Sequence, residues 1–448
     1  MTEQTSSEAS RRPFVVTNRS VLAIAVPMTV AFLTTPLLGV VDTAVVGQLG
    51  DAALLGGLAI GAVTFDLAFA TFNFLRTGTT GLVAQAMGRE DDAEQQAVFW
   101  RALAIAAVSG LVTILLAPLL LYVAGVFFAP EAAVFDALAL YVGIRILAAP
   151  LSLMNYAILG YVLGRGEGAL GLVLQLVLNG SNIALSIFFG LTLGWGLEGV
   201  AWGTVCGELI GAVAGLAIVA VRFLRAGLVP RTRVFDLQAL GAMFTLNRDI
   251  LIRTFVLMAS FALLTRQGAQ LGTLTLAANA VLMNFFLVAT YFLDGFAAAS
   301  EQLAGRAVGA RNGTAFHRSV RLVAIWGFSI ALVLMAVILA SGDRLINLMT
   351  TAPDVRALAA LYIIWIAATP LSGVLAFQMD GVFIGATWSQ DMRNAMLLSF
   401  ALYLVALLSL GALYGNHGLW AALHIFLLAR GVSLYLIMRR RAAAQFGS

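Results

Sequence analysis

One carboxylate, Asp42, lies in a long apolar part of the chain. It falls in the segment LGVVDTAVVGQLG, residues 38–50, near the end of an apolar run that begins at Val21. An ionised side chain at the depth of a lipid bilayer is costly, so such a residue usually faces a protein interior or a water-filled cavity and marks a path for ions or protons. Asp42 is therefore the first candidate for an ion-coupling residue.

A set of polar side chains follows a helical spacing in a later apolar segment. Steps of four, three and four residues place them on one face of a helix. They are Gln175, Asn179, Asn182 and Ser186. Amides that face lipid would lack hydrogen-bond partners, so this face must point into a helix bundle. Two interpretations stay open: hydrogen bonds between helices, worth about 0.6 kcal/mol each, or the lining of an ion pathway.

Acidic residues also recur at helical spacing in two other apolar segments. Thr204 and Glu208 lie one helical turn apart, and a second face carries Thr290, Asp294 and Glu301. Long side chains such as those of Glu208 and Glu301 can reach water if they lie close enough to a membrane end. Each of these two glutamates is therefore either solvated or part of an internal polar site.

Three more charged residues fall within or directly after apolar segments. Asp380, in QMDGVFIG, is either a second titrating site or a residue that reaches the membrane surface. Arg76 and Arg430 are interpreted as anchors at the cytoplasmic interface.

Two arginines, Arg145 and Arg266, lie within or beside apolar segments and away from the basic loops. We expect each to pair with an acid such as Asp66 or Asp294, because an unpaired charge inside a membrane is costly.

The composition is that of a membrane protein with many spans. The chain has 448 residues, of which 61% are hydrophobic and only 11% are charged. A water-soluble domain would need more polar surface. The net charge of +4 comes from arginines scattered through short loops, without the aromatic interleaving of a nucleic-acid site, so we expect no nucleic-acid partner.

No enzyme chemistry is visible in the sequence. The single cysteine, Cys206, excludes a disulfide framework, and His317, His417 and His424 lack the spacing of metal ligands. There is no phosphate-binding loop and no recognisable catalytic triad. We therefore expect no enzyme activity, no metal and no cofactor, and an ion gradient as the source of energy.

Twelve apolar segments are long enough to cross a bilayer, which needs about 20 residues per helix. They are residues 21–46, 53–75, 98–123, 135–159, 169–190, 198–221, 250–271, 276–300, 320–340, 357–379, 395–414 and 418–438. The loops of one parity, together with both ends of the chain, hold most of the arginines. Because cytoplasmic loops carry the excess of positive charge, both termini are predicted to be cytoplasmic. The polar start of the chain is not expected to be a removed signal peptide.

The two halves of the chain repeat each other. A shift of 220 to 222 residues places Gly88 on Gly309 and the PLS segment at 150–152 on that at 370–372. The sequence therefore predicts an all-α polytopic membrane protein with twelve transmembrane helices in two six-helix lobes, related by a pseudo-twofold axis along the membrane normal. The predicted parts are a polar cytoplasmic tail (1–18), an N-terminal lobe (19–225), a cytoplasmic linker (226–249) and a C-terminal lobe (250–448).

The acids are not repeated. Leu264 occupies the position equivalent to Asp42 in the second half. The acids at 294, 301 and 380 have uncharged counterparts in the first half. Unshared acids suggest function rather than scaffold. Pro27 removes a backbone hydrogen bond inside the first span, so we expect either a static kink or a bend that changes when Asp42 is protonated.

An ordered set of motifs resembles the multidrug and toxic compound extrusion (MATE) family, in particular its DNA-damage-inducible protein F (DinF) branch. The motifs are VDTAVVGQLG, RTGTTGLVAQAMGRED, the repeated PLS, NIALS, GVAWGT, YFLDGFAAASEQLAGRAVGA and QMDGVFIGAT. The resemblance covers essentially the whole chain after the tail. It implies a twelve-helix antiporter that exports cationic or amphipathic drugs in exchange for protons or sodium ions.

The resemblance also implies roles for particular residues. Asp42 matches the first-helix carboxylate that is protonated during transport, and Asn182 and Thr204 match its polar partners. Ser186 stands where family members often have an Asp, as in NIVLD, and this loss of a ligand charge weakens a sodium site. Asp380 lies near a tenth-helix acid that binds cations in another branch.

We therefore expect a proton-coupled multidrug antiporter, a monomer in the plasma (inner) membrane, with a drug or toxin, protons and membrane lipids as partners. The alternatives are a sodium-coupled antiporter, a flippase for an amphipathic or lipid-linked substrate, and a channel or structural membrane protein. The expected coupling residues are Asp42, Asn182, Thr204, Ser186 and Asp380. The expected substrate-cavity residues are Asn179, Gln175, Asn155, Asp294, Glu301 and Arg266, with Pro27 as the conformational residue.

Overall fold

The computed structural model describes residues 14–447, and within them every regular element is a helix. The predicted tail therefore lies mostly outside the described residues. The helices of the first half are α1 (Asn18–Gly47), α2 (Ala52–Ala70), η1 (Thr71–Asn73), α3 (Phe74–Gly88), α4 (Asp92–Leu115), α5 (Ala117–Phe128), α6 (Ala132–Arg145), η2 (Ile146–Ala148), α7 (Ala149–Gly164), α8 (Gly168–Ile187), η3 (Phe188–Thr192) and α9 (Gly196–Ala226). Those of the second half are α10 (Arg231–Val234), α11 (Leu237–Gln270), α12 (Thr273–Gly309), α13 (Gly313–Met349), α14 (Pro353–Gly385), α15 (Ser389–Tyr414) and α16 (Asn416–Phe446).

The predicted spans correspond to twelve long helical segments. Within the described residues, eleven are long and apolar enough to cross a membrane, if α2–η1–α3, α6–η2–α7 and α8–η3 are each counted as one. The twelfth is α11, whose first half carries the charged residues Arg248, Asp249 and Arg253. The segment predicted as 98–123 is instead divided, because Pro118 begins the short helix α5.

Polar side chains cap helices at the loops. Asp51, Asp91, Asp236 and Asn312 each accept a hydrogen bond from a backbone N–H in the first turn of the helix that follows. At Asp236 the two N–H donors, Ala239 and Gln238, lower the pKa of the carboxyl below its usual value. These caps fix where α2, α4, α11 and α13 begin.

The sequence repeat is confirmed by backbone conformation. Glu90 and Arg311, which are 221 residues apart, both have positive φ, of 57° and 50°. Gly166 and Thr387, also 221 residues apart, have φ of 77° and 57°. The turns after α3 and α12 therefore have a residue with positive φ at the equivalent position, and so do the turns after α7 and α14.

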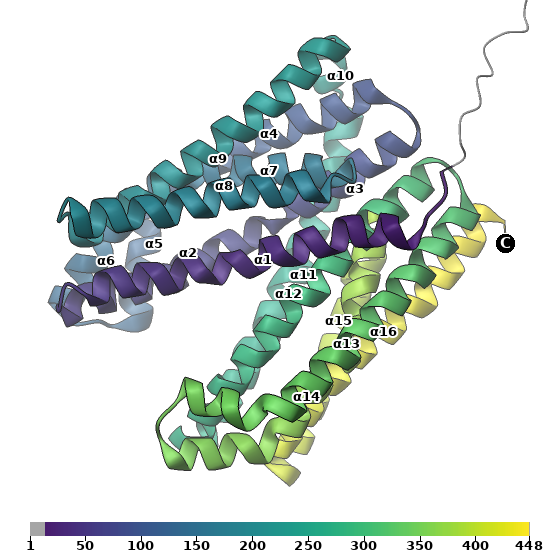
Figure 1. Cartoon of the computed structure of the whole chain (residues 1–448). Coiled ribbons are helices and arrows are strands. Elements are labelled where there is room, and N and C mark those ends of the chain that lie inside the picture. Colours follow the sequence, from purple (N-terminus) through teal and green to yellow (C-terminus); the bar gives the residue numbers. More distant parts are fainter. Residues whose placement is uncertain (1–13, 448) are drawn as a thin grey trace, which may run out of the picture.

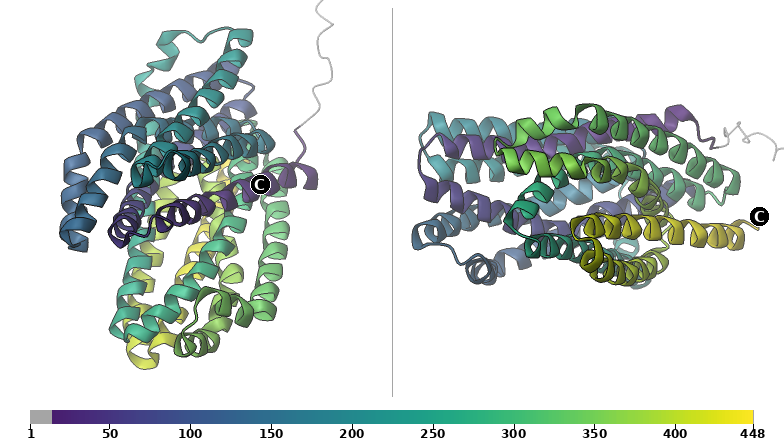
Figure 2. Two further views of the ribbon diagram at one scale, coloured as in Figure 1. Left: turned by 60° about the vertical axis from the view of Figure 1, so that its left-hand side comes forward. Right: turned by 90° about the horizontal axis from the view of Figure 1, so that it is seen from below.

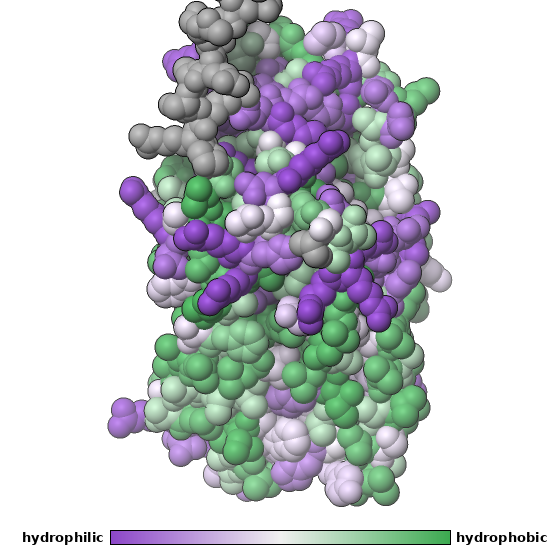
Figure 3. All heavy atoms as spheres, turned by 90° about the vertical axis from the view of Figure 1, so that its right-hand side faces the viewer, coloured by the Kyte–Doolittle hydropathy of each residue, from purple (hydrophilic) through white to green (hydrophobic). Residues whose placement is uncertain are grey.

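The helices form two lobes arranged as a V, with α1 to α9 in one arm and α11 to α16 in the other (Figures 1 and 2). The arms meet at the end where α1 begins and α16 ends, and they separate toward the other end (Figure 1). At the meeting end an apolar cluster includes Met28 and Leu159 of the first lobe and Phe296 and Met379 of the second. Figure 3 looks onto this end and shows hydrophilic side chains gathered over its middle and upper part.

The lobes approach closely where α3 crosses α12. A Cβ on Gly88 would lie 2.1 Å from the backbone oxygen of Arg306, and a Cβ on Gly309 would lie 2.1 Å from that of Gln85. The two contacts are equivalent under the repeat, as expected where helices cross a pseudo-twofold axis. Gln85 adds hydrogen bonds across the lobes, to the Gly385 oxygen at 2.9 Å and the Thr387 hydroxyl at 3.1 Å.

Candidate ion-coupling site and interlobe charge cluster

Asp42 is buried in the first lobe, where α1 lies along α8. Its exposed fraction is 8%, and Oδ1 has no hydrogen-bond partner. Ser186 of α8 interacts with the Asp42 carboxylate, and nearer the other end of α1 the Asn179 side chain donates to the Thr34 hydroxyl at 2.7 Å. The predicted acid and part of the predicted polar face therefore lie together.

The polar face of α8 is completed by its packing on α9. The Ser186 hydroxyl donates to Asn182 Oδ1 at 3.2 Å, and both residues pack against glycines, with a Cβ on Gly203 lying 2.8 Å from Ser186 Oγ. Only glycine lets α9 approach this closely. Thr204, the next residue of α9, is buried and donates to the Val200 carbonyl at 3.2 Å. Its hydroxyl is therefore directed to its own helix.

Two of the residues expected in the substrate cavity lie deeper within the first lobe. Asn155 of α7 donates to the Glu208 carboxylate of α9 at 2.7 Å and to the Glu208 backbone oxygen at 3.0 Å. Gln175 of α8 lines a small pocket together with Asn155 and Gly211. Glu208 is therefore bonded to its neighbouring helix.

The predicted ion pairs of Arg145 and Arg266 are wrong. The Arg145 guanidinium lies over the rings of Phe65 and Phe69, 4.9 and 5.7 Å from their centroids, and no acid of the described chain is within ion-pair distance of it. It still interacts electrostatically with Asp42 and with Asp66, the acid suggested for it by the sequence, from beyond ion-pair distance. Arg266 is exposed near the end of α11 and has no ion pair with a described residue. Aromatic rings thus take the place expected for an acid at Arg145.

Asp380 of α14 lies between two arginines in the second lobe. Arg253 of α11 and Arg430 of α16 both donate hydrogen bonds to its Oδ2, and the exposed fractions of Asp380 and Arg430 are 4% and 1%. The prediction that Arg430 is an interface anchor is therefore wrong. Sequence reasoning missed Arg253, although a charge inside the span predicted for 250–271 was the signal that could have identified it.

Arg76 also has a different role from the predicted anchor. It projects from α3 of the first lobe and forms an ion pair with Glu301 of α12, in the second lobe, at 3.6 Å. Its guanidinium donates to Asn73 at 3.2 Å and lies over the Phe32 ring of α1. Glu301 is only 3% exposed, so the solvated alternative is wrong for this residue.

These charged side chains form one group at the meeting of the lobes. Asp294 of α12 interacts electrostatically with Arg76, Arg253 and Arg430. The group, called here the interlobe charge cluster, contains three arginines and three acids. Its members are Arg76, Arg253, Asp294, Glu301, Asp380 and Arg430. The opposite charges balance, which makes their joint burial possible.

No group of three or more His, Cys, Asp or Glu side chains suitable for a metal ion occurs in residues 14–447. Pro36 lies inside α1 together with Pro27, the proline expected to bend this helix. Each leaves a carbonyl in the preceding turn without its usual N–H partner.

The chain resembles known proteins over almost its full length. The MatE family model matches residues 27–188 and 250–408. The DNA damage-inducible protein F of Escherichia coli (strain K12) is 37% identical over 425 residues, which cover 93% of this chain and 91% of that protein. A probable multidrug resistance protein NorM of Chromobacterium violaceum is 23% identical and covers 97% of this chain and 96% of its own length.

Solved structures share the fold at low sequence identity. A MATE transporter from Vibrio cholerae, VcmN in the bent form, superposes with a TM-score of 0.87 at 20% identity, over 96% of this chain and 97% of that one. An outward-facing multidrug resistance MATE family transporter superposes with a TM-score of 0.83 at 15% identity, over 96% of this chain and 97% of that one. The chain therefore belongs to the MatE family of membrane transporters.

Proposed function

We propose that this chain is a proton-coupled antiporter that exports cationic or amphipathic small molecules, with Asp42 as the residue that exchanges a proton for cargo. The observation that carries this proposal is the setting of Asp42: a buried carboxylate with an unpartnered oxygen beside Ser186, whose hydroxyl donates to Asn182. A buried carboxylate that has no direct ion pair is readily neutralised by a proton, and Arg145 attracts Asp42 only from beyond ion-pair distance. The two related proteins named for multidrug resistance support the export of drugs.

Asp42 differs from the acids of the interlobe charge cluster. Asp380 and Glu301 form ion pairs with arginines, whereas Asp42 has no ion pair with a described basic residue. Binding a proton or a cation at Asp380 would compete with two guanidinium groups. The coupling role therefore falls to Asp42 rather than to Asp380.

The polar neighbours of Asp42 favour protons over sodium ions. Asn182 and Ser186 supply neutral oxygens, and no second carboxylate joins them there. A proton needs only the one carboxylate, and so does a cationic substrate. Protonation of Asp42 would remove the negative charge that attracts the cation, so the two ligands exclude each other.

The V arrangement and the arginine distribution suggest how the cycle runs. The loops at the meeting end carry most of the arginines, so we place this end and both termini in the cytoplasm. The lobes then open outward, and Asp42, close to the end of α1 at Gly47, lies toward the open side. A proton would enter there from outside. Pro27 and Pro36 give α1 two positions at which it can bend when Asp42 is neutralised.

Transport of ethidium by proteoliposomes tests this proposal. The wild-type chain should move the dye against its gradient when a proton gradient is imposed, and a sodium gradient alone should not drive it. Asp42→Asn should reduce transport to the rate of empty vesicles, because Asn cannot carry the proton. The matched control, Asp136→Asn, replaces an exposed acid on α6 and should transport normally. Undiminished transport by Asp42→Asn would refute the mechanism, and transport driven by sodium would favour the sodium-coupled alternative.

A further inference from the structure

A groove lies on the outer surface of the second lobe, between α13 and α16. It has a volume of about 1250 Å³ and is lined on one side by residues 317–328 of α13 and on the other by residues 435–443 of α16. At the terminal end the two helices touch, because the rings of Phe316 and Phe446 lie 5.3 Å apart. The groove is therefore closed toward the end of the molecule that holds the termini and extends along the helices from there.

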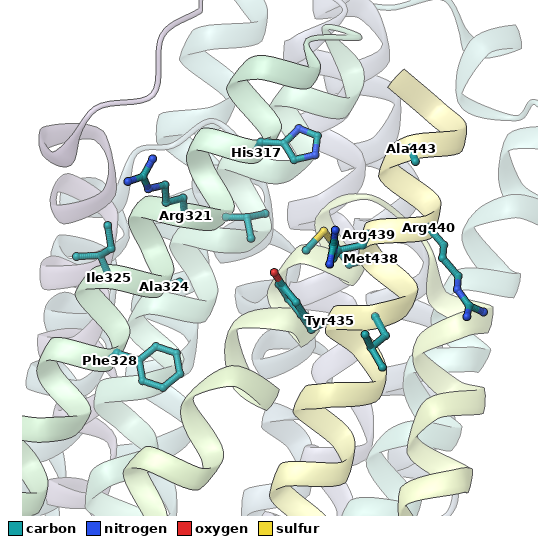
Figure 4. Close-up of a pocket in the computed structure, with 12 residues that line it drawn as sticks. His317, Arg321, Ala324, Ile325, Phe328, Tyr435, Met438, Arg439, Arg440 and Ala443 are labelled. Atoms are coloured by element: carbon teal, nitrogen blue, oxygen red, sulfur yellow. The ribbon is translucent and has the colours of Figure 1, made fainter. Parts of the chain in front are cut away.

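The end of the groove near the termini is basic. Arg321, Arg439 and Arg440 line it, all three are exposed, and none forms an ion pair with a described acid. The lining includes no Asp or Glu. Figure 4 shows Arg439 pointing from α16 toward α13, whereas the side chains of Arg321 and Arg440, at the two edges, extend outward from the groove. Exposed arginines without ion-pair partners suit a phosphate group, which a guanidinium can bind through two hydrogen bonds.

The rest of the groove is apolar. Ile325 and Phe328 follow Arg321 along α13, and they are 51% and 39% exposed. Leu436 follows on α16, and the Tyr435 ring projects into the groove between the two helices (Figure 4). From Arg321 to Phe328 a helix rises about 10 Å, at about 1.5 Å per residue. The basic end is thus joined to an apolar channel that follows the direction of a lipid chain.

We propose that this groove binds one anionic glycerophospholipid of the leaflet at the terminal side. Its phosphate contacts Arg439, with Arg321 and Arg440 at the edges, and an acyl chain lies against Ile325, Phe328 and Leu436. Charge complementarity selects the occupant: a zwitterionic lipid brings a cation that three arginines would repel. The site is separate from Asp42 and does not depend on how transport is coupled.

Native mass spectrometry of the full-length chain with added lipid tests the proposal. Dioleoyl phosphatidylglycerol is the anionic probe and dioleoyl phosphatidylcholine is the zwitterionic one. Wild type should retain phosphatidylglycerol in preference to phosphatidylcholine. The variant Arg321→Gln/Arg439→Gln/Arg440→Gln should bind phosphatidylglycerol about tenfold more weakly or worse, because each basic residue near an anionic surface contributes to the attraction.

The matched control is Arg318→Gln/Arg441→Gln. These two arginines lie on the same helices but do not line the groove, and Arg441 is paired with Asp391 at 2.6 Å. The control should keep wild-type affinity, and thermal unfolding without lipid should show that both variants are folded. Equal losses in the two variants, or equal retention of both lipids by wild type, would overturn the proposal. A second variant, Phe328→Ser, tests the acyl contact and should weaken binding without changing the preference between headgroups.

Discussion

The buried acids Asp42 and Asp380 have opposite electrostatic settings. Asp380 is bonded to two guanidinium groups, Arg253 and Arg430, whereas Asp42 has a hydroxyl neighbour and one unpartnered oxygen. A buried charge with two partners stabilises the fold, because removing it leaves both partners as buried charges without compensation. The same residue type therefore suits a cycling site in one lobe and a fixed link between α11, α14 and α16 in the other.

The substitution Asp380→Asn should destabilise the chain by about 3–5 kcal/mol, because it leaves two buried arginines without a compensating charge. The added substitution Arg430→Gln should restore part of the loss. Thermal unfolding in detergent measures both effects. The control, Asp391→Asn, breaks an exposed pair with Arg441 and should cost at most about 1 kcal/mol. If Asp380→Asn cost no more than this control, Asp380 would not be a structural link.

At this scale, sequence reasoning could identify Asp42 but not the partners of the arginines. An acid in an apolar segment is visible without a fold, and so is the spacing that places Asn182 and Ser186 on one face. The group around Asp380 joins α11, α14 and α16, which are far apart in the chain, so no local pattern predicts it. Asp66, the acid expected for Arg145, attracts it only from beyond ion-pair distance, and the two phenylalanine rings beside the guanidinium could not be predicted from spacing along the chain.

Among the elements, α3 shows why hydropathy misplaces helix ends. The sequence predicted a span ending at residue 75, but helical structure continues to Gly88. The polar residues beyond that point do not interrupt it, since the Thr77 and Thr80 hydroxyls donate to carbonyls one turn earlier, at 3.2 and 2.9 Å. Gly88 at the end of this extension lets α3 lie against α12, and Gly81 lets it lie against α14.

Gly88→Ala should weaken the crossing of α3 and α12, because the added Cβ would lie 2.1 Å from the Arg306 backbone oxygen. Overpacking of this kind costs about 1–3 kcal/mol. Gly309→Ala should have a similar effect, since its contact with Gln85 is the equivalent one in the repeat. Thermal unfolding checks both variants.

Gly180→Ala on α8 is the matched control for this crossing. A Cβ at Gly180 meets nothing within 4 Å, so the substitution should be neutral or slightly stabilising. Equal behaviour of Gly88→Ala and Gly180→Ala would show that the crossing is loose enough to absorb a methyl group.

For the whole molecule, the repeat predicted two lobes of like topology but not how they meet. Two copies of a six-helix unit can touch at either end, and the shared glycines do not say which. The contact at the meeting end, where α1 begins and α16 ends, includes the α3–α12 crossing and the ion pair between Arg76 and Glu301. These two charged residues are not equivalent in the repeat. The asymmetric charges are therefore what could tune the balance between open and closed ends.

Loss of the Arg76–Glu301 pair should shift the lobes away from the V arrangement. Arg76→Gln/Glu301→Gln removes this ion pair between the lobes. Both partners become neutral, so neither is left as an unpaired buried charge. Spin labels at Asp51→Cys and Thr351→Cys, in loops at the separated end, report the opening, with Cys206→Ala to remove the native thiol. Their distance distribution should gain a shorter component in the double variant, because weaker contact at one end lets the other end close.

Single substitutions distinguish this pair from general loss of stability. Arg76→Gln and Glu301→Gln should not add up to the effect of the double variant, since residues in direct contact couple by about 0.5–3 kcal/mol. The control Arg344→Gln changes an exposed arginine of α13 at the separated end and should leave the distances unchanged. An unaltered distribution in the double variant would mean that the apolar and glycine contacts hold the lobes together without the ion pair.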